Sequence, residues 1–372
     1  MLKFIKTFSV FVGTIIGVGI FGLPYVALKA GFPTTLIYLL FLFLIAVFLH
    51  IIYGKVAVGT KELHRLPGYV GEYLGPAWKN LSFFIIGLGL VGALLAYLII
   101  GGGFLNSIFS SYFGGNFLIY TLFFFISGSY LIFRGIKAIS LIELPILAAF
   151  YTILALFFWK ARPFIDPSYF KGVNLKFSFL PYGPILFSLW GLSVIPELKE
   201  MLEGRMESLK KVIIAGILVS AVTYLAFIFV VFGSSGPLTS EDAISGLGNI
   251  FGSNTIKLGF LFGVFTAFDS FVILGLTLKK IFQYDFGVSH KTAFLLTILM
   301  PLALFLAGIR RFIDVIGFTG AVAIGSEAII VVFLYREFLR KKFSREMSIF
   351  YYFLPIFFVF GIIIESFYFF SR

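Results

Sequence analysis

Three oxygen-bearing side chains, Thr266, Asp269 and Ser270, lie close together in the middle of a long apolar segment. A charged group at the centre of a bilayer costs about 2.5–3.5 kcal/mol on insertion scales, so Asp269 is expected to face the protein interior. Carboxylate and hydroxyl oxygens at this spacing suit Na⁺, a hard cation. If its surroundings keep it neutral, Asp269 would carry H⁺ instead. A structural aspartate paired with a neighbouring helix is the third possibility, and the residue types leave all three open.

A second feature is a break in the first apolar segment, Gly17-Val18-Gly19-Ile20-Phe21-Gly22-Leu23-Pro24. Close helix packing alone would explain spaced glycines, but it does not need Pro24 or two glycines as close as Gly17 and Gly19. Lipid cannot hydrogen-bond a broken backbone, so such a break belongs beside protein or a water-filled cavity. The break would free the carbonyls of Gly13 and Ile16 for a cation. It would also aim the N-terminus of a half-helix at a bound anion.

The sixth apolar segment repeats this irregularity in Leu189-Trp190-Gly191-Leu192-Ser193-Val194-Ile195-Pro196. Two broken helices, each the first of a five-span block, are typical of inverted-repeat transporters. The two blocks would cover residues 6–160 and 181–338, and residues 348–370 would add one more helix. Residues 1–372 would then form a single transmembrane domain.

Four more side chains are candidates for the same site. Tyr97 lies midway along the third span, where either its hydroxyl donates to a substrate carboxylate or its ring faces lipid or the core. Phe187 and Trp190 in the sixth span would close over a ligand. Glu327 lies mid-span in the tenth segment and is either a second proton carrier or a structural hydrogen-bond partner. Apolar walls would favour an apolar or aromatic substrate; they would come from Phe21, Phe187, Trp190, Leu192 and Phe268.

The composition indicates a membrane protein. A hydrophobic content of 60%, a charged content of 12% and a mean hydropathy of +1.06 exclude a soluble globular domain. Segments of about 20 apolar residues recur, and each is long enough to cross a bilayer. We expect an all-α polytopic chain with eleven transmembrane helices, at about 6–29, 34–58, 80–109, 116–134, 137–160, 181–201, 210–233, 256–281, 291–309, 312–338 and 348–370.

Two connections between these spans are informative. Little more than Gly135 and Ile136 joins the fourth and fifth spans, which therefore form an antiparallel pair. Residues 61–79 are too polar to span a bilayer and are expected to form an interfacial helix or a folded loop.

The net charge of +12 comes mainly from lysine and arginine in short loops between spans. This pattern is what the positive-inside rule requires, so nucleic acid is not an expected partner. The distribution favours a cytoplasmic N-terminus and, with an odd number of spans, an external C-terminus. The expected partners are the lipid bilayer and a small-molecule substrate, and the only expected cofactor is a coupling ion.

Enzyme chemistry is not expected. The chain has no cysteine, which excludes thiolate metal sites. His50, His64 and His290 lie near the ends of spans and are not expected to cluster, and the protease, hydrolase and nucleotide-binding motifs are absent.

These motifs resemble the amino acid–polyamine–organocation superfamily, and within it the amino acid/auxin permease and aromatic amino acid permease branches. The matching residues are Gly13-Thr14-Ile15-Ile16-Gly17-Val18-Gly19-Ile20-Phe21-Gly22-Leu23-Pro24-Tyr25 with Lys29-Ala30-Gly31, the run Ile195-Pro196-Glu197-Leu198, and Asp269-Ser270-Phe271, where family members commonly carry Thr-Ser-Phe. The resemblance implies a LeuT-like fold of 5+5 inverted repeats plus one helix. It also implies secondary transport of neutral amino acids across the plasma membrane, coupled to Na⁺ or H⁺.

Position by position, the resemblance assigns the substrate and ion contacts. The substrate carboxylate would lie on the backbone of Ile16, Gly17, Val18, Gly19 and Ile20. The ammonium would lie on carbonyls between Phe187 and Trp190, with Phe187 as an occluding aromatic. The sodium site of related carriers corresponds to Gly13, Ile16, Thr266, Asp269 and Ser270.

The resemblance leaves the coupling ion and the mode of action open. Some proton-coupled relatives place a lysine in the fifth span, and the stretch from Phe150 to Thr152 has none, whereas Asp269 replaces the usual threonine. Na⁺ and H⁺ therefore both remain. A non-transporting nutrient sensor, similar to germinant receptor subunits, and an amino acid exchanger are the alternatives to a symporter. The identity of the amino acid and the oligomeric state are not predicted.

Overall fold

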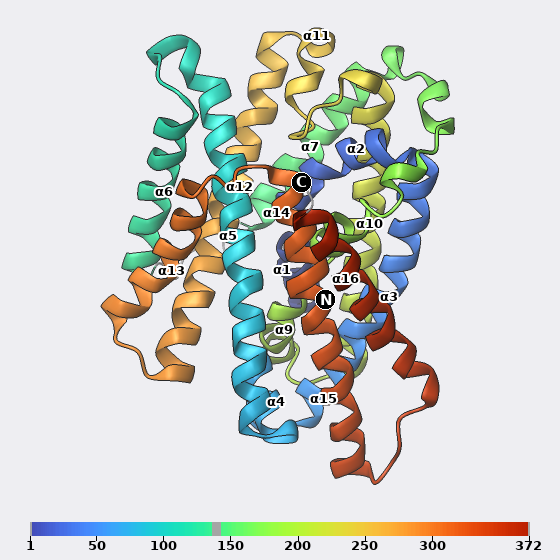
Figure 1. The fold of residues 1–372 in the computed structure, drawn as a ribbon, viewed down its shortest axis with the longest axis vertical. Coiled ribbons are helices and arrows are strands. Elements are labelled where there is room, and N and C mark those ends of the chain that lie inside the picture. The colour runs from blue at the N-terminus through green and yellow to red at the C-terminus, as the bar shows by residue number, and fades with distance from the viewer. Residues whose placement is uncertain (1, 136–142, 371–372) are drawn as a thin grey trace.

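The computed structural model describes residues 2–135 and 143–370, and every regular element in these ranges is helical. The helices follow the predicted spans in order: α1 (Leu2–Ile15) with α2 (Gly19–Ala30), α3 (Phe32–Gly59), α5 (Pro76–Phe113), α6 (Phe117–Arg134), α7 (Glu143–Ala161), α8 (Tyr182–Ser188) with α9 (Ile195–Met201), α10 (Met206–Ser235), α12 (Ser253–Phe286), α13 (His290–Leu306), α14 (Phe312–Phe318) with α15 (Gly325–Phe343), and α16 (Phe353–Phe370). The predicted junction at Ile136 and the start of the fifth span lie outside the described residues. All eleven predicted spans have a helical counterpart (Figure 1).

Five of these helices are by themselves long and apolar enough to cross a membrane, the continuous run Phe312–Phe343 from α14 to α15 makes a sixth, and α1 with α2 makes a seventh. The outward faces of α3, α5 and α16 carry large apolar side chains such as Ile37, Phe84 and Phe367, which are 67%, 68% and 78% exposed. Such a surface needs a lipid environment or a partner, because water would not tolerate an apolar patch of this extent.

The predicted breaks in the first and sixth spans are present. The axes of α1 and α2 differ by 51° across Ile16, Gly17 and Val18. In the sixth span α8 and α9 are separated by Leu189 to Val194, the last part of which is the short 3₁₀ turn η5 (Leu192–Val194). Both helices of that pair have only seven residues.

The tenth span is also irregular, because the π-helical segment η8 (Thr319–Ile324) lies between α14 and α15. This segment packs directly on α8, backbone against backbone. A Cβ atom added to Gly183 would overlap the carbonyl of Gly317, and one added to Gly320 would overlap the carbonyl of Gly183. Only glycine fits at these two positions, so they hold α8 and the tenth span at their closest approach.

The polar segment 61–79 forms α4 (Leu66–Leu74), which packs against α5 and α15. Figure 1 shows α4 and the basic end of α15 at one end of the molecule and α11 (Gly248–Phe251) at the other. Arg65 pairs with Glu197 at 2.6 Å, and Lys199 donates to the Thr60 carbonyl at 3.0 Å. These contacts connect the ends of α3, α4 and α9 into one polar cluster.

We expect Gly183→Ala to lower the thermal stability of the detergent-solubilised protein, because the new methyl group must displace the Gly317 backbone. Overpacking of this kind costs about 1–3 kcal/mol. The matched control is Gly87→Ala in α5, where an added Cβ has no neighbour within 4 Å. Equal melting temperatures for the two variants would contradict the close approach of α8 and the tenth span.

Candidate functional site

The backbone hydrogen bonds of the first break differ from those of a continuous helix, and the difference leaves carbonyls free for a cation. The Gly17 N–H donates to the Ile15 carbonyl at 2.9 Å, and the Ile20 N–H donates to the Gly17 carbonyl at 3.4 Å. In a continuous helix these amides would donate to Gly13 and Ile16, four residues earlier. The carbonyls of Gly13 and Ile16 therefore lose their usual donors.

The same break leaves donors at the start of α2. Within the described residues, the N–H groups of Val18 and Gly19 donate to no backbone carbonyl, whereas the Phe21 N–H donates back to Val18 at 3.0 Å. Free amides at a helix N-terminus, with the positive end of the helix dipole behind them, form a ready site for an anion such as a carboxylate.

In the second break one amide is held by a histidine from α3. The Gly191 N–H donates to Nε2 of His50 at 3.1 Å, and Nδ1 of His50 lies 2.7 Å from the Ala46 carbonyl. An amide can only donate, so Nε2 is the acceptor and the proton is on Nδ1, which donates to Ala46. The imidazole is fully buried, and its ring lies 5.3 Å from that of Trp190.

This contact corrects the prediction that the histidines lie near span ends. His50 lies well inside α3 and touches the break, whereas His64 lies in the connection before α4. The overlooked signal was an ionisable residue in an otherwise apolar run, which is by itself a candidate functional residue.

The two breaks lie against each other. A Cβ added to Gly19 would lie 3.1 Å from Cα of Ser188, and one added to Gly191 would lie 2.7 Å from Cγ1 of Ile15. Gly19 thus packs on the last residue of α8, and Gly191 packs on the last residue of α1. The first and sixth spans are therefore in direct contact at their breaks.

A cavity of about 140 Å³ lies beside this contact. By the space that one water needs, it would hold about ten water molecules, which suits a single amino acid better than a peptide or a lipid. Its walls contain almost every residue predicted for the site, namely Gly13, Ile16, Gly17, Gly19, Ile20, Tyr97, Phe187, Trp190, Thr266, Asp269, Ser270 and Glu327. Among the residues predicted to bind substrate or ion, the exception is Val18, whose side chain is fully buried and which does not line the cavity.

Two predicted wall residues point elsewhere. Leu192 is fully buried in the turn η5, and the ring of Phe268 packs edge-on against Phe124 of α6 at 5.5 Å. Neither contributes to the cavity, whose aromatic walls include Phe150 and Phe262 instead.

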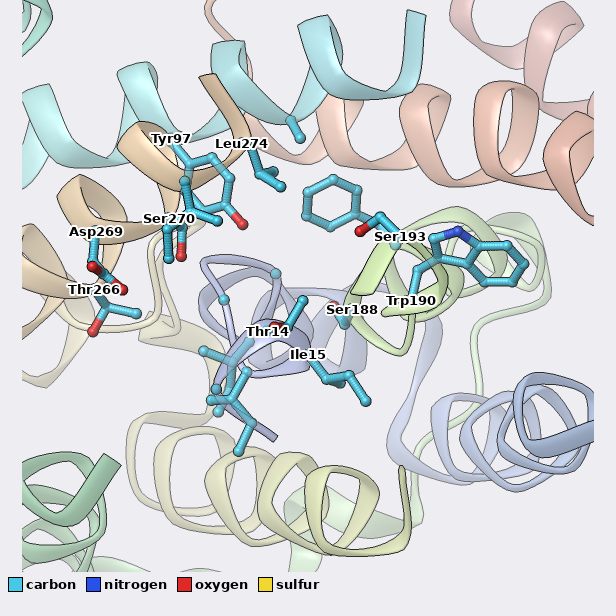
Figure 2. Close-up of a pocket in the computed structure, with 18 of the residues that line it drawn as sticks. Thr14, Ile15, Tyr97, Ser188, Trp190, Ser193, Thr266, Asp269, Ser270 and Leu274 are labelled. Carbon is cyan, nitrogen blue, oxygen red and sulfur yellow. The ribbon is translucent and has the colours of Figure 1, made fainter. Parts of the chain in front are cut away.

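The oxygen cluster of α12 lies at one side of this cavity (Figure 2). Thr266, Asp269, Ser270 and Ile273 share one face of the helix, at the spacing that places residues above one another. Within the described residues Asp269 accepts no hydrogen bond and forms no ion pair. The Thr266 hydroxyl donates to the Phe262 carbonyl at 3.0 Å, which leaves its lone pairs free. These groups form a set of hard oxygen ligands at the cavity wall.

Tyr97 faces the first break from α5. Its hydroxyl would lie 2.8 Å from a Cβ added to Gly17, and it lies beside Ser270 (Figure 2). The phenol therefore lies between the break and the oxygen cluster. There it borders the backbone of the break, on which the substrate carboxylate was predicted to lie.

Glu327 is held by the second break. The indole Nε1 of Trp190 donates to Oε2 of Glu327 at 2.9 Å, across the sixth and tenth spans. The carboxyl group is thus a hydrogen-bond acceptor at the cavity wall. This contact agrees with the structural alternative, and a proton-carrying role stays a prediction.

The chain matches a family model described as the tryptophan/tyrosine permease family over residues 2–366. It is similar to the tyrosine-specific transport system 1 of Haemophilus influenzae, with 26% identity over 333 residues that cover 83% of this chain and 81% of that protein.

Solved structures share the fold at low identity. The crystal structure of MhsT in complex with L-phenylalanine has a TM-score of 0.69 and 16% identity, and the match covers 98% of both chains. Mhp1, a nucleobase-cation-symport-1 family transporter in a closed conformation with bromovinylhydantoin bound, has a TM-score of 0.66 and 13% identity over 92% of this chain and 79% of that one. The predicted LeuT-like fold is confirmed.

At the ends of α1 and α9 that lie away from the breaks, the two broken spans are joined by charge, because Glu203, in the turn after α9, pairs with Lys3 of α1 and with Arg205 at 2.8 Å. The Lys3 ammonium and the Arg205 guanidinium lower the pKa of the exposed Glu203 carboxyl. A lowered pKa means that this contact stabilises the folded protein at neutral pH and is lost as the pH falls through the folded-state pKa.

We therefore expect Glu203→Gln to lower the melting temperature slightly at pH 7 and low salt, and to lower it less in acid or in high salt. The control Glu207→Gln removes a nearby exposed carboxyl with no ion pair among the described residues. The effect is measured from melting curves of both variants at about pH 3 to 7, a range that includes the usual pKa values of carboxyl groups. A difference that persists unchanged in acid would rule out the ion pair as its cause.

Proposed function

The chain belongs to the tryptophan/tyrosine permease family, and we propose that it carries aromatic amino acids across the plasma membrane by secondary active transport. The observation that supports this most is the cavity between the two breaks, because free amides, free carbonyls and aromatic rings meet there. Alternating access would expose this cavity first to one side of the membrane and then to the other. In this proposal the N-terminus is cytoplasmic and the C-terminus is external.

The two ends of a zwitterion match the two breaks. The carboxylate would accept from the amides of Val18 and Gly19 at the start of α2 and from the Tyr97 hydroxyl. The ammonium would donate to carbonyls between Phe187 and Trp190. The aromatic side chain would then lie against Phe187 and the other rings of the wall, where burial of apolar area supplies binding free energy.

A cation would bind beside the substrate, at Asp269 with Thr266, Ser270 and the carbonyls of Gly13 and Ile16. Both Na⁺ and H⁺ fit a carboxylate that has no partner among the residues that the structure describes. Na⁺ would use all five oxygens, whereas H⁺ would need only the carboxyl group of Asp269 or that of Glu327.

Purified protein in proteoliposomes should accumulate radiolabelled L-tyrosine, L-tryptophan or L-phenylalanine when a Na⁺ or a pH gradient is imposed. Lysine and glutamate should compete at least about tenfold more weakly, because their charged side chains would be buried among aromatic rings without a partner. Protein-free liposomes are the control. Saturable binding without uptake under either gradient would indicate the sensor, and exchange without accumulation would indicate the exchanger.

Asp269→Asn should abolish the dependence of uptake on the gradient while leaving exchange of amino acids across the membrane. Asp166→Asn makes the same change in an exposed loop, where the Ser168 N–H donates to the carboxylate at 2.8 Å, and should transport normally. Glu327→Gln keeps an acceptor for Trp190 but cannot carry a proton. If H⁺ is the coupling ion, comparing this variant with Asp269→Asn therefore shows which of the two carboxyl groups carries the proton. Unchanged coupling in the Asp269 variant would reject Asp269 as the cation ligand.

A further inference from the structure

A buried tyrosine of α10 joins the ends of the two half-helices. The side chain of Tyr224 is fully buried, and its hydroxyl donates to the Ile15 carbonyl and to the Ser188 carbonyl, at 2.7 Å each. Ile15 is the last residue of α1, and Ser188 is the last residue of α8. Figure 2 shows Ile15 and Ser188 close to one another beside the cavity.

The Ile15 carbonyl also accepts from the Gly17 N–H, but only the Tyr224 hydroxyl joins it to the Ser188 carbonyl among the described residues. Both lie at the C-terminal end of a helix, where the peptide dipoles leave partial negative charge. Two such ends that converge in a buried place repel each other unless a donor or a cation stands between them. The hydroxyl proton of Tyr224 supplies that donor, and the side chain that carries it is fully buried.

The same residues make the other contacts between the breaks. Ile15 is the residue that Gly191 packs against, and Ser188 is the residue that Gly19 packs against. Tyr224 therefore bonds to both halves of this reciprocal contact, from a helix that has no break of its own. It is placed to set the distance between the breaks rather than to touch the substrate.

A phenol has one proton, and here it serves two acceptors. The two bonds share that proton as long as both carbonyls stay close to the hydroxyl. If one half-helix moves away, the proton remains with the other carbonyl, so the phenol is never left without a partner. If a Na⁺ ion bridged the two carbonyls instead, the same movement of one half-helix would remove one ligand from the ion.

We propose that Tyr224 is a positioning residue that holds the ends of α1 and α8 together in the substrate-ready site and releases one of them when the site opens. It occupies the place of a cation between the breaks, so the coupling ion binds only on the Asp269 side. This inference rests on the proposed transport function.

The test is Tyr224→Phe, which removes one oxygen and keeps the ring. The matched control is Tyr151→Phe: the Tyr151 hydroxyl lies 3.0 Å from the hydroxyl of Thr223, the neighbour of Tyr224 on α10, and the described structure gives it no contact with either break. Binding of radiolabelled L-tyrosine to purified protein gives the affinity and the active fraction separately. We expect the affinity to fall about tenfold in Tyr224→Phe and to stay within about twofold in Tyr151→Phe.

A second readout does not need substrate. The chain has no cysteine, so Ser193→Cys places a single thiol on the cavity wall, where Ser193 lies. In that background Tyr224→Phe should speed the reaction of the thiol with a water-soluble maleimide in the absence of amino acid, because the breaks separate more often. Tyr151→Phe should leave the rate unchanged.

The outcomes are distinguishable. If the parent protein binds no aromatic amino acid, the proposed function fails, and the thiol rate alone still decides on Tyr224. A lower melting temperature or active fraction with unchanged affinity and unchanged thiol rate would make Tyr224 merely structural and overturn the proposal. Faster labelling with weaker binding supports it.

Discussion

The Gly17 amide donates to Ile15 and not to Gly13, and this change leaves polar backbone groups at the depth of the membrane. Lipid offers such groups no partner, so each must be satisfied by protein or by what the protein binds. His50 accepts from one amide of the second break, and Tyr224 donates to the carbonyl that ends each half-helix. The described residues give no backbone partner to the carbonyls of Gly13 and Ile16 or to the amide of Gly19, and these three groups border the cavity. This is why that cavity suits a zwitterion and a cation.

The breaks themselves were predictable from sequence, because they depend on local chemistry. Glycine and proline concentrated inside an apolar run interrupt a helix whatever surrounds it. The face of α12 was predictable for a similar reason, since Thr266, Asp269 and Ser270 keep the helical period. The span order followed from apolar length alone.

The direction in which side chains near the cavity point was not predictable. Leu192 lies in a 3₁₀ turn, where the helical period does not hold, and it points into the core. Phe268 is one residue before Asp269, so its side chain points about 100° away around the helix, toward α6. The partners of the breaks, His50 and Tyr224, come from α3 and α10 and depend on tertiary packing. His50 at least carried a local signal, as an ionisable residue in an apolar span, but a tyrosine in an apolar span has none.

The hydrogen bond between Trp190 and Glu327 gives the protein an optical property. Of its three tryptophans, Trp78 and Trp159 are 38% and 63% exposed on the outer surface, and only Trp190 contributes to the cavity wall. Indole emission depends on the polarity and charge around the ring. Movement of the sixth span relative to the tenth would therefore shift the emission maximum of Trp190. Opening of the cavity would then be detectable in the intrinsic fluorescence of the unlabelled protein.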